Sequence, residues 1–120
     1  MLQFFNEVSH ELTRHRVLTE YRAGAITRES ICDADYLLAT AAAHHGWASK
    51  SICPVCESEN LRMVYWIYGE QLGKISGSAR SLAEIEDFAK TGREFTVHTV
   101  EVCPDCRWNH LLTIATAVDR

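Results

Sequence analysis

The sequence predicts an α+β fold, because its two halves carry different patterns. Residues 1–50 show apolar residues at helical spacing and an alanine-rich stretch, whereas residues 51–120 hold three runs rich in aromatic and β-branched residues. Two copies of a Cys-Pro-x-Cys pattern accompany those runs, "CPVC" at 53–56 and "CPDC" at 103–106. We expect an N-terminal helical hairpin over 1–50, packed on a three-stranded antiparallel ribbon with an inserted helix over 51–120, together as one compact domain.

The first expected helix lies in "FFNEVSHELTRHRVLTEYRAG", where Phe5, Val8 and Leu12 form one stripe. Gly24 suits the end of this helix. The stripe drifts around residues 14–16, so a bend or a break is allowed there.

A second helical stretch follows a short link. Thr27 suits an N-cap, with Glu29 in the first turn. "DADYLLATAAAHHG" predicts a strong helix that begins near Asp33 or Asp35 and ends at Gly46. A helical hairpin is favoured over a DNA-reading helix-turn-helix, because this helix lacks a row of side chains suited to base edges.

Three strands are expected in the second half, at 61–69, 94–102 and 108–118. The glycine-containing stretch after the first strand indicates a loop. It leads into a helix at 82–91, whose start carries a capping box of Ser81 and Glu84.

The two cysteine patterns predict one metal site. Each Cys-x-x-Cys turn presents two sulfurs, and antiparallel pairing of the neighbouring strands would bring the turns together. Four thiolates are the ligand set of a structural, tetrahedral zinc ion, which is the arrangement of a zinc ribbon. The expected ligands are Cys53, Cys56, Cys103 and Cys106. Because all four positions are taken by protein, no position remains for a catalytic water.

Other uses of these cysteines fit less well. Disulfides need an oxidising compartment, and the N-terminus shows no signal-peptide pattern. A thioredoxin-like site uses one Cys-x-x-Cys beside a βαβ unit, which is not indicated here. An iron–sulfur cluster uses the same four thiolates and stays as the minor alternative.

Further residues near the turns are candidates for lesser roles. His98 and His110 are candidates to replace a cysteine as a metal ligand or to donate a hydrogen bond to one. Because four cysteines are already available, partly packed strand residues are favoured. Cys32 stands at the head of the alanine-rich helix, and a small buried side chain is favoured there over a redox role.

Partner contacts are expected from two places. Arg107 and Trp108 follow the second cysteine turn, where an exposed pair would form a recognition hot spot. Trp108 equally suits the cap of the small core. Lys74 and Arg80 flank the glycine-containing stretch "GKISGSARS", which lacks the pattern of a nucleotide-binding loop and indicates an ordered surface loop.

Charge and hydropathy limit the classes of function. The formal net charge of −4 gives no basic excess for non-specific binding to nucleic acid. No apolar run reaches the roughly 20 residues of a membrane helix, and we expect a cytoplasmic protein.

The motifs "CPVC", "GEQLGKISGSARS" and "VEVCPDCRWNHL", preceded by "ICDADYLL", resemble a family of small actinobacterial proteins defined as a domain of unknown function. The resemblance covers about residues 23–112 and implies a cytoplasmic protein that contains a zinc ribbon. It implies no substrate or catalytic residue. The paired turns alone are also similar to zinc ribbons of transcription and translation proteins, a fold-level analogy.

Three functions follow as hypotheses, and none of them is an enzyme. The first is a non-catalytic module that binds a protein partner, associated with RNA polymerase or the ribosome. The second is a nucleic-acid binder that uses the helical hairpin and an arginine patch of Arg14, Arg16, Arg22 and Arg28. The third is a thiol or zinc redox sensor that involves Cys32.

Overall fold

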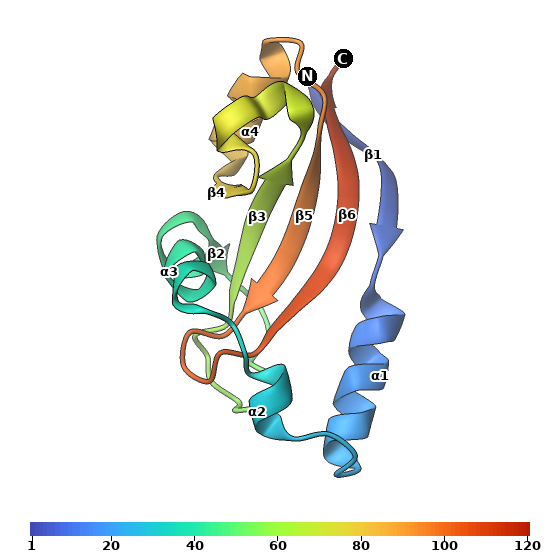
Figure 1. Cartoon of the computed structure of the whole chain (residues 1–120), viewed down its shortest axis with the longest axis vertical. Helices are drawn as coiled ribbons and strands as arrows, with labels where there is room; N and C mark the ends of the chain where they lie inside the picture. The colour runs from blue at the N-terminus through green and yellow to red at the C-terminus, as the bar shows by residue number, and fades with distance from the viewer.

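The computed structural model describes all 120 residues and is built around one six-stranded sheet. The strand order is β1-β6-β5-β3-β2, β4 also pairs with β3, and every pair is antiparallel. Its elements are β1 (Leu2–Ser9), α1 (Glu11–Arg22), α2 (Arg28–Ile31), α3 (Tyr36–His45), β2 (Trp47–Ala48), β3 (Arg62–Tyr68), η1 (Glu70–Ile75), β4 (Ser78–Arg80), α4 (Leu82–Lys90), β5 (Phe95–Val102) and β6 (Asn109–Asp119). In Figure 1 the long strands run along the molecule, with α4 near one end and α2 near the other.

The predicted helix over the first residues is wrong, because the chain begins with strand β1. This strand pairs with β6, with Phe4 opposite Ala117 and Val8 opposite Ile114. A bulge between these positions includes Asn6, which has a positive φ of 53°. Since β6 is eleven residues long, its outer edge would leave a row of backbone groups unpaired without β1. Tertiary pairing therefore overrides the helical spacing of Phe5, Val8 and Leu12.

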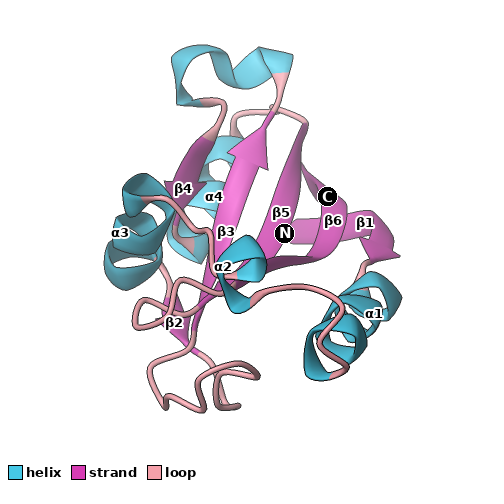
Figure 2. Ribbon diagram, turned by 60° about the horizontal axis from the view of Figure 1, so that its bottom comes forward, coloured by secondary structure: helices cyan, strands magenta, loops and turns pink.

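The helical hairpin and the three-stranded ribbon are also wrong. Helix α1 contacts β6, whereas α3 contacts β3, β4 and β5. Figures 1 and 2 place the two helices on different sides of the sheet. The three predicted strands are present as β3, β5 and β6, but β1, β2 and β4 extend them into a larger sheet.

Local helix signals are confirmed where side chains cap the helices. The Thr27 hydroxyl accepts a hydrogen bond from the Ser30 amide, and Asp35 accepts one from the Leu38 amide at the start of α3. At the start of α4, Ser81 and Glu84 form the predicted capping box. The loop before it holds more structure than expected, namely η1 and β4. No helix of the chain combines the length and apolar character that a membrane crossing requires.

The core is divided into three clusters along the sheet. One lies under α4 and η1 and includes Ile67, Ile85 and Phe95. The second lies under α3 and includes Val64 and Val102. Their side chains point to the opposite face of the sheet from those of Ile67 and Phe95. The third lies at the end of the sheet that carries the cysteine turns, and its buried members are Leu18, Ile31, Cys53, Leu61, Cys103 and Trp108.

Candidate metal centre

Antiparallel pairing brings the two cysteine turns to the same end of the sheet. The first turn precedes β3 and the second follows β5, and Arg62 at the start of β3 lies opposite Val102 at the end of β5. As a result, the sulfurs of Cys53, Cys56, Cys103 and Cys106 all lie within 4.8 Å of one another. The predicted gathering of the four cysteines is confirmed.

The two turns have the same backbone design. In each, the residue after the second cysteine has a positive φ, 63° at Glu57 and 71° at Arg107. Their amides donate to the carbonyls of Cys53 and Cys103 at 3.0 and 2.8 Å. A non-glycine residue in this region costs on the order of 1 kcal/mol. The same cost at equivalent positions indicates that both turns are shaped by the need to present two sulfurs.

Backbone amides also point at the sulfurs. The Val55 amide donates to the Cys53 sulfur at 3.4 Å, and the Trp108 amide donates to the Cys106 sulfur at 3.4 Å. Such bonds stabilise thiolates, which are the form that binds a metal.

The spacing of the sulfurs fits a single tetrahedral ion. Tetrahedral zinc with sulfur ligands at about 2.3 Å places neighbouring sulfurs about 3.8 Å apart. The pairs Cys53–Cys106 and Cys56–Cys103 are separated by 3.7 and 3.6 Å. An iron–sulfur cluster inserts several iron and sulfide atoms between its cysteines and so needs wider spacing. All five cysteines of the chain are free thiols.

Burial disfavours the thiolate form of two of the four cysteines. Burial raises the pKa of Cys103 to about 11 and also raises the pKa of Cys106. At Cys56 burial acts in the same direction, but a hydrogen bond involving the Ser58 backbone and contacts with the other sulfurs leave the pKa lowered. A cation that binds here must therefore displace protons, so its affinity falls as the pH falls.

A polar contact ties the first turn to the second. The carboxylate of Asp105 accepts hydrogen bonds from the Ser58 hydroxyl and from the Asn60 side-chain amide, the latter at 3.0 Å. These donors lower the pKa of Asp105. The turns are thus held together by side chains as well as by the sulfurs.

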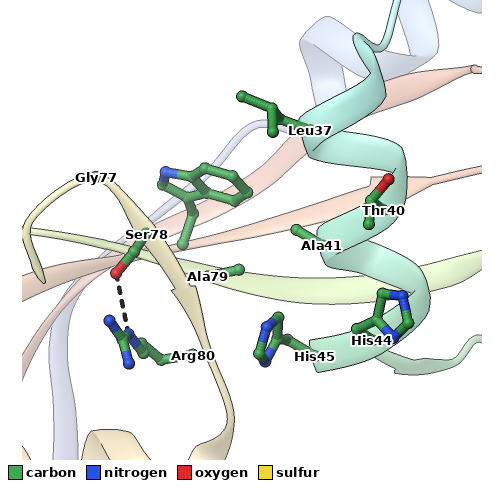
Figure 3. A pocket seen from close by; sticks show the side chains of 10 residues that line it. Leu37, Thr40, Ala41, His44, His45, Gly77, Ser78, Ala79 and Arg80 are labelled. Carbon is green, nitrogen blue, oxygen red and sulfur yellow. Dashed lines mark hydrogen bonds between the residues drawn. The ribbon is translucent and has the colours of Figure 1, made fainter.

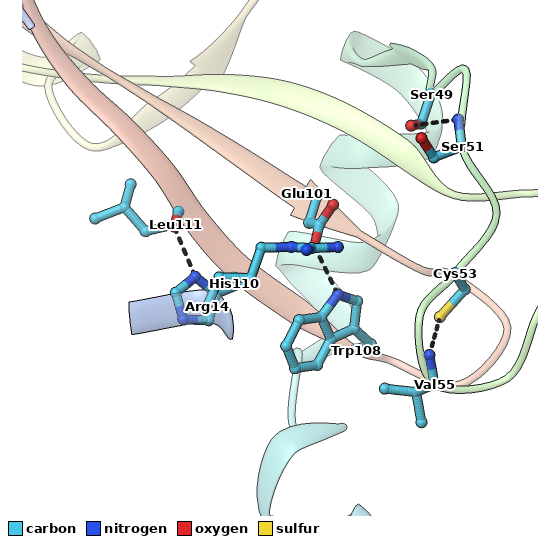
Figure 4. A network of polar contacts seen from close by, with 9 residues as sticks. All are labelled: Arg14, Ser49, Ser51, Cys53, Val55, Glu101, Trp108, His110 and Leu111. Atoms are coloured by element: carbon cyan, nitrogen blue, oxygen red, sulfur yellow. Dashed lines mark hydrogen bonds and ion pairs between the residues drawn. The ribbon is translucent and has the colours of Figure 1, made fainter. Parts of the chain in front are cut away.

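Trp108 lies inside the molecule and not on its surface. Its side chain is 1% exposed, and its indole N–H donates to Glu101 at 3.0 Å. The same oxygen of Glu101 accepts a hydrogen bond from Arg14 of helix α1, as Figure 4 shows. Trp108 therefore joins the metal end to α1. Of the two places predicted for its side chain, the position in the core is confirmed and the exposed hot spot is wrong.

The other predicted contact residues are spread over the molecule. Arg107 is exposed beside the second turn, and Lys74 is exposed in η1. Arg80 of β4 forms an ion pair with Glu84 at 3.1 Å. The structure does not bring these residues together.

Neither candidate histidine donates to a cysteine. The His98 ring packs at a tilt against Tyr68, with ring centroids 4.6 Å apart, and burial, followed by the nearby His10, lowers the pKa of its ring. His110 stacks on Trp108 and contacts the Leu111 carbonyl through Nδ1 at 2.6 Å. His110 therefore reaches the metal end only through Trp108.

Two features of the site were not expected from the sequence. Glu101 is 5% exposed, and the signal for its burial is its place in the alternation Phe95, Val97, Thr99, Glu101. Cys32 lies 3.8 Å from Cys106, sulfur to sulfur. No local pattern marks that contact, because the two residues are 74 positions apart.

Comparison with known proteins places the chain in a family. Residues 1–117 match DUF5318, a family of unknown function. The chain belongs to this family. It is 44% identical over 105 residues to uncharacterized proteins of Mycobacterium tuberculosis (strain H37Rv) and Mycobacterium bovis, which covers 88% of this chain and 77% of each relative. The predicted resemblance to an uncharacterised actinobacterial family is confirmed. No solved structure matches the chain.

Proposed function

We propose that this DUF5318 protein is a non-catalytic module that binds a protein partner in the cytoplasm and is stabilised by one structural zinc ion. The metal part of the proposal is supported by the four sulfurs, whose separations suit one ion. Four protein ligands complete a tetrahedral shell and leave no position for a reacting water. The site therefore suits a structural role.

The observation that carries the partner-binding role is the outer face of α3. Tyr36 and Leu37 are 71% and 72% exposed, although most surface helices direct polar residues outward. Large exposed apolar side chains that adjoin one another are typical of a protein-binding surface. We call these two residues, with the cavities on either side of α3, the α3 surface.

One cavity of the α3 surface lies between α3 and β4. It has a volume of about 460 Å³ and is lined by Leu37, Ala41 and His45 on one side and Ser78 to Arg80 on the other, as Figure 3 shows. The indole of Trp66 also lines it. This cavity combines apolar walls with a rim of polar side chains, as protein interfaces do.

The second cavity lies on the other side of α3, over the sheet. It measures about 380 Å³ and shares Leu37 and Trp66 with the first. Tyr68, His98 and Leu111 also line it. Aromatic residues are enriched at the centres of interfaces, so a partner that inserts apolar side chains beside α3 fits this surface.

The hypotheses about the partner differ in their basis. The hypothesis of RNA polymerase or the ribosome rests only on the likeness of the cysteine turns to zinc ribbons. Nucleic-acid binding through a helical hairpin loses its basis because no hairpin forms, and Arg14 is engaged by Glu101.

The experiment begins with affinity purification of the tagged protein from a nuclease-treated native extract, with metal analysis of the same eluate. The recovered protein is identified, purified and titrated against wild type and two variants. Leu37→Ser alters the α3 surface, whereas Leu12→Ser changes an equally apolar side chain, 88% exposed, on α1.

We expect one zinc per chain, a partner that resists nuclease, and an affinity at least roughly tenfold lower for Leu37→Ser only. Equal affinities of the two variants would contradict the α3 surface. Partners that vanish with nuclease would favour a nucleic-acid binder, and iron in place of zinc would correct the metal.

A further inference from the structure

A fifth sulfur lies against the metal centre. The sulfur of Cys32 is 3.8 Å from that of Cys106, about as close as the sulfurs within the group of four, whose contacts measure 3.6 and 3.7 Å. Because a tetrahedral ion takes four ligands, Cys32 is left as a thiol in contact with a ligand.

Two hydrogen bonds hold Cys32 in this place. Cys32 ends helix α2, and the segment after it runs along the second cysteine turn. The Ala34 amide donates to the Arg107 carbonyl at 3.0 Å, and the Asn109 side-chain amide donates to Asp33 at 2.8 Å. The contact between the two sulfurs is therefore fixed by the neighbouring chain and does not depend on side-chain rotation alone.

Both sulfurs of this pair are partly accessible. Cys53 and Cys103 are fully buried, whereas Cys32, Cys56 and Cys106 are half-buried, and Cys32 is the half-buried cysteine that lies outside the group of four.

We propose that Cys32 and Cys106 form a reversible disulfide in the presence of a hydroperoxide. Formation of this disulfide takes the Cys106 ligand away from the metal ion, and the ion is then released. This redox switch is separate from the partner-binding role and needs only the metal centre. The oxidant is hydrogen peroxide or an organic hydroperoxide.

The reaction balances in two steps. The thiolate of Cys32 attacks one peroxide oxygen, so that the O–O bond breaks, water leaves after protonation, and Cys32 becomes a sulfenic acid. The sulfur of Cys106 then attacks the Cys32 sulfur, an S–S bond forms, and hydroxide leaves as a second water. Overall the two sulfurs lose two electrons, and hydrogen peroxide takes them up with two protons and becomes two waters. An organic hydroperoxide becomes one alcohol and one water in the same way. A dithiol reductant reverses the change.

The test uses the metal-loaded protein, after its metal content has been measured. Substoichiometric hydrogen peroxide is added, metal release is followed with a chromophoric chelator, and disulfides are located by peptide mass spectrometry. The variants are Cys32→Ser and the double change Cys32→Ser with Ser30→Cys. The second moves the thiol by two residues on the same short helix and controls for the mere presence of a fifth cysteine.

For wild type we expect a Cys32–Cys106 peptide that appears together with the released metal, both reversed by a dithiol when metal is present. Release should be roughly tenfold slower in both variants. Equal release rates in wild type and Cys32→Ser would overturn the proposal. A disulfide within one turn, such as Cys53–Cys56, would overturn it as well. The mapping in wild type needs no variant, so it decides the question even if a variant loses its metal during purification.

Discussion

At one end of the sheet, helix α4 packs Ile85 and Ala89 against Ile67 and Phe95, whereas at the other end sulfur atoms occupy the middle of the cluster. The α4 end is an apolar core in which Ile67 and Ile85 are fully buried. The metal end combines a few apolar side chains with four sulfurs and a buried carboxylate, Glu101. The same strands, β3, β5 and β6, link the two ends.

The difference shows what each end requires to be stable. Burial of aliphatic side chains stabilises the α4 end without any ligand, at about 25 cal/mol per Å² of apolar surface. The metal end buries thiols and one charged group, which cost free energy unless each is paired or bound. A metal ion offsets that cost for the thiols, and Arg14 with Trp108 offsets it for Glu101.

The largest effect is expected when a metal ligand is removed. Cys53→Ser should release the metal and destabilise the metal end by more than about 5 kcal/mol, because binding free energy at such sites is also folding free energy. Hydrogen exchange should accelerate at residues 53–58 and 103–108, and remain slow in α4. A strong chelator added to wild type is the control and should give the same exchange pattern. Unchanged thermal stability and exchange without metal would refute the structural role of the ion.

The next effect lies at the other end. Ile85→Ala leaves a cavity under α4 and should lower the free energy of unfolding by about 3 kcal/mol, as measured by chemical denaturation. The variant should retain its full metal content. Leu82→Ala, in the same helix but 46% exposed, is the matched control and should cost less than about 1 kcal/mol. Metal loss in Ile85→Ala would show that the stability of the metal end depends on the packing at the α4 end.

The comparison also explains which parts of the structure could be predicted. Ser81 with Glu84 was sufficient to place the start of α4, and Asp35 was one of two candidates for the start of α3, because a helix cap depends on residues three apart. The four cysteines could be grouped for a similar reason, since two Cys-x-x-Cys turns beside paired strands leave little other geometry. These predictions rest on local chemistry.

What could not be predicted depends on distant residues. Strand β1 forms because β6, more than one hundred residues later, offers it an edge. The residues Leu2–Ser9 carry no pattern that predicts this pairing. The contact of Cys32 with Cys106 depends on the path of the chain after α2. The buried carboxylate of Glu101 is paired with Arg14 of α1, which lies 87 positions earlier in the chain. In each case the local sequence does not indicate which distant residue makes the contact.

The smallest of the three effects tests the polar part of the metal end. Arg14→Met keeps the apolar stem and leaves the Glu101 carboxylate with Trp108 as its remaining donor. A buried charge that loses its partner is costly. Because Arg14 is partly exposed and water can take its place, we expect a loss of about 2 kcal/mol in chemical denaturation, with the metal retained.

Two further variants separate the charge from the packing. Arg16→Met changes an exposed arginine on the same helix and should alter the free energy of unfolding by less than about 0.5 kcal/mol. The double variant of Arg14→Met with Glu101→Gln removes the unpaired charge, so it should be more stable than Arg14→Met alone. If the double variant is instead less stable by the sum of both changes, Arg14 acts through its packing against the sheet. The metal end would then resemble the α4 end more closely than its hydrogen bonds indicate.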